Sequence, residues 1–137
     1  MEKMPKYSKL EHEKKWLLKK KSLPSLEALD KTKIVDKYFP ETKIRLRKMT
    51  NLKSGENVYK LCKKYGKLTN TSEPITNIYL NESEYLLLNN LPGYILTKNR
   101  YGYPFHDKLY SIDEFTRSME PFYLLELEIG DGESFED

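Results

Sequence analysis

The chain has 137 residues with a formal net charge of +3, and 33% of its side chains are charged. This length fits a single domain, whose core we place at residues 7–129, with a flexible acidic tail at 130–137. The basic residues are spread along the chain, which argues against a duplex nucleic-acid partner. One cysteine, no Cys/His ligand set and no long apolar run exclude an internal disulfide, a zinc site and a membrane span, and indicate a cytoplasmic protein.

The chain reads as a series of short strands with two small helices. Strands are expected at 7–18, 34–39, 43–49, 56–65, 94–101, 103–115 and 122–129, and helices at 25–31 and 81–90. The second helix is well marked, because Asn81 is a good N-cap and Pro92 follows its end. Gly102 marks a turn between two of the strands. Short connections force antiparallel pairing, so six or seven strands predict an α+β, closed or nearly closed, antiparallel barrel.

Charged residues recur at every second position in five of these strands. Side chains two residues apart lie on the same face of a strand, so each such pair predicts a charged face. The pairs and triplet are Glu11, Glu13 and Lys15, then Arg45 and Arg47, Lys60 and Lys64, Lys98 and Arg100, and Glu126 and Glu128. Any one of them could be the solvated face of a half-buried strand.

Taken as a set, these residues favour a charged interior. Acidic and basic pairs fall on different strands, and the opposite face of several strands is apolar. Cations gathered inside a barrel require a polyanion, and gathered carboxylates require a divalent metal. A metal-bound polyphosphate supplies both.

The order and spacing of these motifs resemble the CYTH group, the triphosphate tunnel metalloenzymes. Residues 11–15 fit the ExExK signature of that group. The later matches are Ile34-Val-Asp-Lys-Tyr38, Arg45-x-Arg47, Leu61-Cys-Lys-Lys64, Lys98-x-Arg100-Tyr101, Ile112-Asp113-x-Phe115 and Glu126-x-Glu128. The resemblance covers about residues 8 to 129.

The resemblance implies a CYTH-like antiparallel tunnel that binds a triphosphate-containing small molecule together with Mg²⁺ or Mn²⁺. The implied metal-binding residues are Glu11, Glu13, Asp113, Glu126 and Glu128. The implied phosphate ligands are Lys15, Arg45, Arg47, Lys64, Lys98 and Arg100. Glu11, Glu13 and Lys15 of the signature are the implied catalytic residues.

Several residues have more than one reading. Asp113 could instead cap a helix, and Asp107 competes with it for the metal role. Lys60 shares a face with Lys64 but could be a solvated lysine at the entrance of its strand. His12 alternates with the signature acids and is expected to face outward. Cys62 is read as inert packing.

The chain departs from the family at its C-terminal end, where relatives continue with a further strand and helix. A missing last wall would leave an exposed sheet edge, so a homodimer is one expectation. Three functions stay open: metal-dependent hydrolysis of tripolyphosphate or of a nucleoside or organic triphosphate, a class IV-type adenylate cyclase reaction, and binding of polyphosphate or nucleotide without catalysis. Hydrolysis is the first choice.

Overall fold

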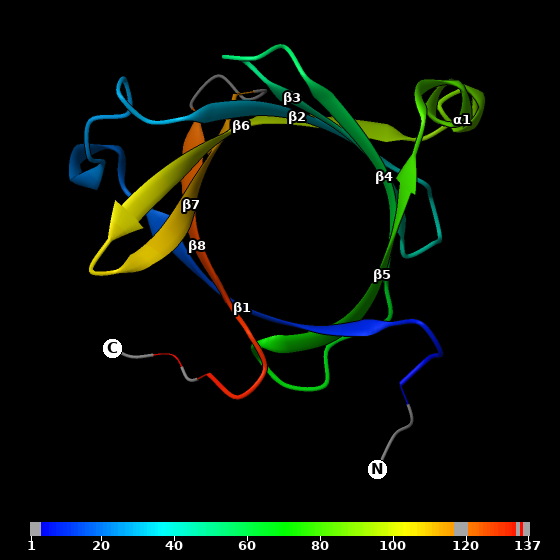
Figure 1. The fold of residues 1–137 in the computed structure, drawn as a ribbon, viewed down its shortest axis with the longest axis horizontal. Coiled ribbons are helices and arrows are strands. Elements are labelled where there is room, and N and C mark those ends of the chain that lie inside the picture. The colour runs from blue at the N-terminus through cyan, green and yellow to red at the C-terminus, as the bar shows by residue number, and fades with distance from the viewer. Residues whose placement is uncertain (1–3, 117–120, 134, 136–137) are drawn as a thin grey trace.

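The computed structural model describes residues 4–116, 121–133 and 135, and shows a closed antiparallel β-barrel (Figure 1). This confirms the predicted fold class. The elements are β1 Lys9–Leu18, the 3₁₀ helix η1 Lys20–Ser22, β2 Lys31–Tyr38, β3 Ile44–Asn51, β4 Asn57–Lys64, β5 Ser72–Leu80, α1 Glu82–Leu88, β6 Tyr94–Phe105, β7 Lys108–Phe115 and β8 Phe122–Ile129.

The barrel closes through β1, which pairs with strands on both sides. The strand order is β1-β5-β4-β3-β2-β6-β7-β8. The first part of β1 pairs with β5 as far as His12, and the stretch from His12 to Leu18 pairs with β8. The last wall is therefore present within the described residues. The exposed sheet edge on which the homodimer expectation rested does not exist at this seam.

The apolar clusters of this barrel lie on its outer face. One cluster joins Leu46 and Tyr59 of the wall to Tyr85 of α1, so the helix covers β3 and β4 from outside. A second cluster centres on Tyr101, Ile112 and Tyr123, with leucines of the 18–29 segment packed against it. These residues alternate along their strands with the charged ones. The interior is thus free to be polar.

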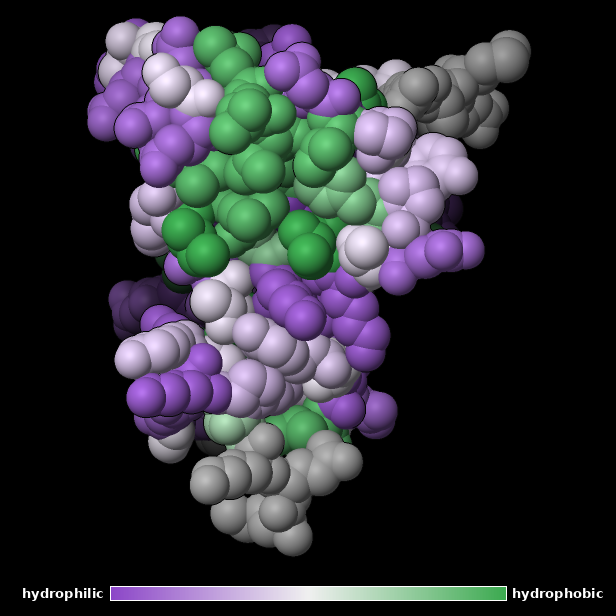
Figure 2. All heavy atoms as spheres, turned by 90° about the vertical axis from the view of Figure 1, so that its right-hand side faces the viewer, coloured by the Kyte–Doolittle hydropathy of each residue, from purple (hydrophilic) through white to green (hydrophobic). Residues whose placement is uncertain are grey.

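The outer surface around α1 also exposes apolar side chains. Figure 2 shows them gathered over the upper part of the face that carries α1 and β4. Leu86, Leu87 and Leu91 belong to this surface and are each at least half exposed. Only part of the helix is used to cover the barrel.

Two local predictions are wrong. Residues 25–30 form no helix and Lys31 already belongs to β2, because Leu26 and Leu29 pack onto the second outer cluster. Within this segment the Leu29 amide donates a turn hydrogen bond to the Leu26 carbonyl. Gly102 is not a turn, since β6 runs through it. The chain reverses at His106 and Asp107, whose φ values of 47° and 63° suit a tight two-residue hairpin.

One strand was not predicted at all. β5 occupies residues 72–80, for which neither a strand nor a helix was expected. β5 brings the number of strands in the described barrel to eight and completes it between β4 and β1. Of the predicted acidic tail, Gly130 to Glu133 form a turn in which Glu133 accepts a hydrogen bond from the Gly130 amide, and residues 134, 136 and 137 lie outside the described part.

No helix in the described ranges is both long enough and apolar enough to cross a membrane.

Candidate functional site

The barrel encloses a cavity of about 290 Å³ whose walls are mostly charged. We call this cavity the tunnel. Eight cationic and four acidic side chains line it: Lys9, Lys15, Arg45, Arg47, Lys60, Lys64, Lys98 and Arg100 with Glu11, Glu13, Glu126 and Glu128. The remaining lining residues are Cys62, Ile75, Asn77 and Tyr79. The excess of positive charge fits an anionic occupant.

The strand register places the charged residues in cross-strand pairs. Glu13 lies opposite Glu128, and Lys15 lies opposite Glu126, because β1 and β8 run side by side. The acids therefore share the β8–β1 wall. That wall faces β2 and β3 across the barrel, and β3 carries Arg45 (Figure 1). An occupant of the tunnel would lie between carboxylates and guanidinium groups.

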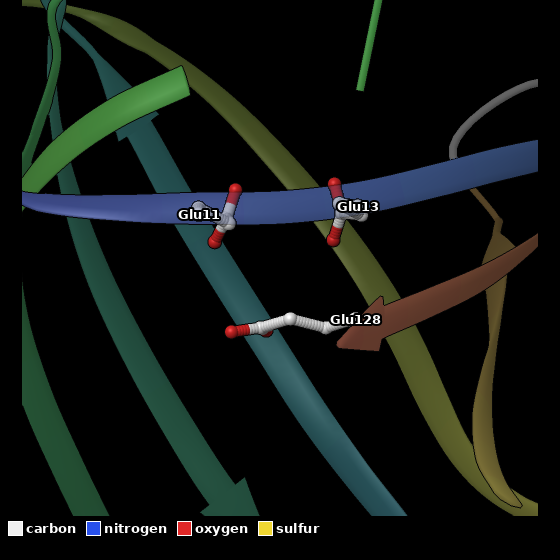
Figure 3. Close-up of side chains that lie close together, drawn as sticks. All are labelled: Glu11, Glu13 and Glu128. Atoms are coloured by element: carbon white, nitrogen blue, oxygen red, sulfur yellow. The ribbon is translucent and has the colours of Figure 1, made fainter. Parts of the chain in front are cut away.

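Three carboxylates on the acidic wall come together closely enough to share one cation. Oxygen atoms of Glu11, Glu13 and Glu128 all lie within 4.8 Å of one another. Figure 3 shows Glu11 and Glu13 side by side on β1, with Glu128 reaching toward them from β8. Hard divalent ions such as Mg²⁺ and Mn²⁺ prefer carboxylate oxygens. The donor set fits such an ion, and like charges this close favour a cation between them.

Glu126 and Lys15 lie beside this group but are engaged with each other and with their neighbours. Lys15 Nζ is 3.4 Å from Glu13 and 3.7 Å from Glu126. Burial, with the charges of Asp113 and Glu13, raises the pKa of Glu126. Burial alone would lower the pKa of Lys15, but the charges of Glu13 and Glu126 outweigh it and raise that pKa. Lys15 thus partly neutralises two carboxylates of the acidic wall.

Two buried aspartates behind the lining hold the cations in place. Asp36 accepts hydrogen bonds of 2.7 and 2.8 Å from Arg47. Asp113 accepts bonds of 2.8 and 2.9 Å from Arg100 and lies 2.7 Å from Lys98 Nζ. Both aspartates have no exposed surface. Each fixes the orientation of a guanidinium that lines the tunnel.

The surroundings of Asp113 differ from those of the three clustered carboxylates. Burial would raise the pKa of Asp113, but hydrogen bonds and charge from Arg100 and Lys98 outweigh it and hold that pKa below its usual value. Asp113 does not line the tunnel. Asp107 lies in the β6–β7 turn and does not line it either. Asp113 therefore positions Arg100 and Lys98, and its role as a metal ligand stays a prediction.

Arg45 and Lys60 are less fully neutralised than Arg47 and Arg100, each of which forms two hydrogen bonds with a buried aspartate. The Nε of Arg45 is buried without a hydrogen-bond partner in the described chain, and its ion pair with Asp36 is long, at 3.9 Å. Burial, then the charges of Arg47 and Arg45, lower the pKa of Lys60. Positive charge is therefore concentrated on β3 and β4.

All the predicted site residues except Asp113 line the tunnel, and Lys64 does so 3.8 Å from Glu11. His12 faces outward as expected and contacts Ser72 and Asp131. Sequence reasoning missed Lys9, Asn77 and Tyr79. The last two lie on β5, and the β-branched and aromatic content of Ile75–Leu80 was the signal that could have identified that strand.

No protein-family model matches the sequence, and a search of curated proteins finds no significant match. Among solved structures, a protein from Bacillus halodurans described as a "putative adenylate cyclase" has a similar fold, with a TM-score of 0.62 and 12% sequence identity. The superposition covers 91% of this chain and 83% of that chain. At this identity the likeness concerns the fold, and it agrees with the CYTH-like barrel expected from the motifs.

Proposed function

We propose that the tunnel binds a triphosphate with a divalent cation and hydrolyses it. The observation that carries the proposal is the placement of opposite charges on opposite walls. Three clustered carboxylates occupy the β8–β1 wall, and Arg47, oriented by buried Asp36, lies on β3 of the facing wall. Arg100, oriented by buried Asp113, lies on β6 between these walls, 3.4 Å from Glu126. A chain of phosphates bound to a divalent ion has the complementary charge distribution.

The residues divide the work by their chemistry. Glu11, Glu13 and Glu128 would hold Mg²⁺ or Mn²⁺. Such an ion, when bound, neutralises phosphate oxygens and acidifies a water molecule. Arginine forks match phosphate oxygens in a bidentate manner, and Asp36 holds Arg47 ready to do so.

Other cations complete the proposed binding of the phosphate chain. Lys98 and Arg100 are both held by Asp113, so their positive charges are fixed before a ligand arrives. Lys15 and Lys64 stand nearest the carboxylates, at the side of the tunnel where the metal and the phosphates would meet. Preorganised charge of this kind stabilises the charge that develops on the phosphoryl group during its transfer.

The test is phosphate release from tripolyphosphate with Mg²⁺, with Mn²⁺ and with a chelator. We expect release with a metal ion and none with the chelator. Glu13→Gln should abolish release, whereas Glu56→Gln, an exposed residue outside the tunnel, should not change it. Release that persists in the chelator or in the Glu13 variant would contradict the proposal.

A cyclase reaction is the second candidate, and the fold of the Bacillus halodurans protein favours it. The same assay distinguishes the two when ATP is the substrate, because a cyclase forms cyclic AMP and pyrophosphate while a hydrolase releases phosphate. If the protein binds tripolyphosphate or ATP but forms neither phosphate nor cyclic AMP, the result would support the third function, binding without catalysis.

A further inference from the structure

Tyr79 contributes the one aromatic ring among the described residues that line the tunnel. It lies on β5 in the same alternation as Ile75 and Asn77, which also line the tunnel. Its side chain is nevertheless 69% exposed. The ring therefore stands beside the charged cavity and in contact with solvent, outside both apolar clusters.

The exposure has a simple cause in the strand pairing. β1 begins at Lys9, which lies opposite Ile75, so its pairing with β5 covers only Ser72 to Ile75. β5 continues along β4 for five more residues, so that Tyr79 lies opposite Lys60. Beyond Lys9, no strand of the described chain pairs with this edge of β5. The tunnel therefore opens beside Tyr79, and Lys9 marks the rim of that opening.

Tyr79 is also the last of four cross-strand neighbours, the first of which is the buried Asp36. Asp36, Arg47, Lys60 and Tyr79 lie directly opposite one another on β2, β3, β4 and β5. The Nζ of Lys60 is 5.5 Å from the centre of the Tyr79 ring. A phosphate bound to Arg47 and Lys60 would consequently have the ring as its next neighbour toward the opening.

We propose that Tyr79 is a specificity-determining residue that stacks on the planar base of a nucleoside triphosphate while Lys60 and Arg47 bind its phosphates. The inference rests on the proposed function of the tunnel as a triphosphate site and adds which triphosphate it prefers. A ring at the mouth offers nothing to unsubstituted tripolyphosphate. It offers a π face to a base, and base–aromatic stacking is tolerant of base identity.

The test compares the dissociation constants of ATP and tripolyphosphate, measured by calorimetry with Mg²⁺ for the full chain and its variants. We expect Tyr79→Ala to weaken ATP binding about tenfold more than tripolyphosphate binding, as the loss of one stacking partner predicts. Tyr79→Trp should restore the wild-type ratio because it restores a ring. Tyr94→Ala removes an equally exposed tyrosine, 71% exposed and outside the tunnel lining, and should leave the ratio unchanged.

The outcomes separate this inference from the function on which it rests. Equal weakening of both ligands in Tyr79→Ala, or no weakening of ATP, would overturn the stacking role while the triphosphate site stands. A wild-type protein that binds tripolyphosphate but not ATP would overturn it as well. Failure of the wild-type protein to bind either ligand would overturn the triphosphate site itself. Circular dichroism and thermal melting of each variant confirm that the fold is retained.

Discussion

Asp36 and Arg47 lie directly opposite each other on β2 and β3, joined by two parallel hydrogen bonds of 2.7 and 2.8 Å. The aspartate has no exposed surface, and the arginine reaches the tunnel from it. Arg100 and Asp113 repeat the arrangement on β6 and β7. A buried acid thus orients each guanidinium, so that the tunnel is built with its cations in fixed directions.

The first prediction concerns the stability of this pair. Asp36→Asn removes the charge that balances Arg47, and loss of one partner of a buried ion pair is strongly destabilising. We expect the free energy of unfolding to fall by about 3 kcal/mol, at the low end of such losses because the tunnel itself is polar. Urea denaturation at neutral pH measures it. Glu41→Gln, an exposed change in the β2–β3 turn, is the control, and an equal effect of both variants would refute the pairing.

The second prediction concerns the clustered carboxylates in the absence of triphosphate. Mn²⁺ should raise the melting temperature of the wild-type protein, because it relieves the repulsion among Glu11, Glu13 and Glu128. Glu128→Gln should weaken Mn²⁺ binding at least about tenfold, as removal of a metal-supporting group typically does. Calorimetric titration gives the affinity. If Mn²⁺ binds the variant as tightly as the wild type, the metal lies elsewhere.

The third prediction concerns the Nε of Arg45, which has only a long ion pair with Asp36. This buried group lacks a hydrogen-bond acceptor in the described chain, and a phosphate oxygen would supply one. Arg45→Ala should weaken tripolyphosphate binding about tenfold or more, and Arg45→Lys should recover only part of it because the planar fork is lost. Lys48→Ala removes a cation of the same strand that does not line the tunnel. Comparable losses in the Arg45 and Lys48 variants would indicate a nonspecific charge effect.

The fourth prediction is a pH dependence of stability through Asp113. Its pKa is held below the usual value of 3.8 in the folded chain, so the unfolded chain binds a proton more readily. The charged carboxylate therefore stabilises the fold above about pH 4, and this contribution is lost as the pH falls through the lowered pKa. Urea denaturation should show a large stability difference between wild type and Asp113→Asn at pH 6 that shrinks toward pH 3. A difference independent of pH would exclude the carboxylate charge as its cause.

The fifth prediction tests where the hydrophobic stabilisation of the barrel resides. Leu46, which is 1% exposed, packs outward against Tyr59 and Tyr85. Leu46→Ala should lower the free energy of unfolding by about 3 kcal/mol, as in other large-to-small core substitutions. Asn77→Ala on the tunnel side should change it by less than about 0.5 kcal/mol, since the residue is exposed. Denaturant titration of both variants decides this.

Most of the charged interior could be predicted from sequence because side-chain alternation is a local property. Glu11 and Glu13 lie on one face of β1 whatever the strand packs against. The helix after Asn81 was equally accessible, and the structure confirms it with a capping box between Asn81 and Glu84. These features depend on neighbours a few residues apart in the chain.

Features that depend on distant partners were not accessible in the same way. The leucines near residues 26–29 have helical spacing, yet their position is decided by the outer cluster onto which they fold. Asp113 reads as one more acid until the register places Arg100 opposite it. β5 lacks clear alternation because its far end stands at the tunnel opening rather than against a second strand. Register and closure are properties of the whole sheet.

Both apolar clusters lie on the outer face of the barrel, so the residues that stabilise the fold differ from the residues that line the tunnel. In a barrel whose interior is filled by packed apolar side chains, a substitution of an inward-facing residue disturbs the fold. Here the residues around Leu46 and Ile112 keep the wall intact from outside. Substitutions of the lining residues can therefore adapt the tunnel to a different anion or a different charge pattern without loss of the fold. The condition is that Asp36 with Arg47, and Asp113 with Arg100, are each replaced as a pair.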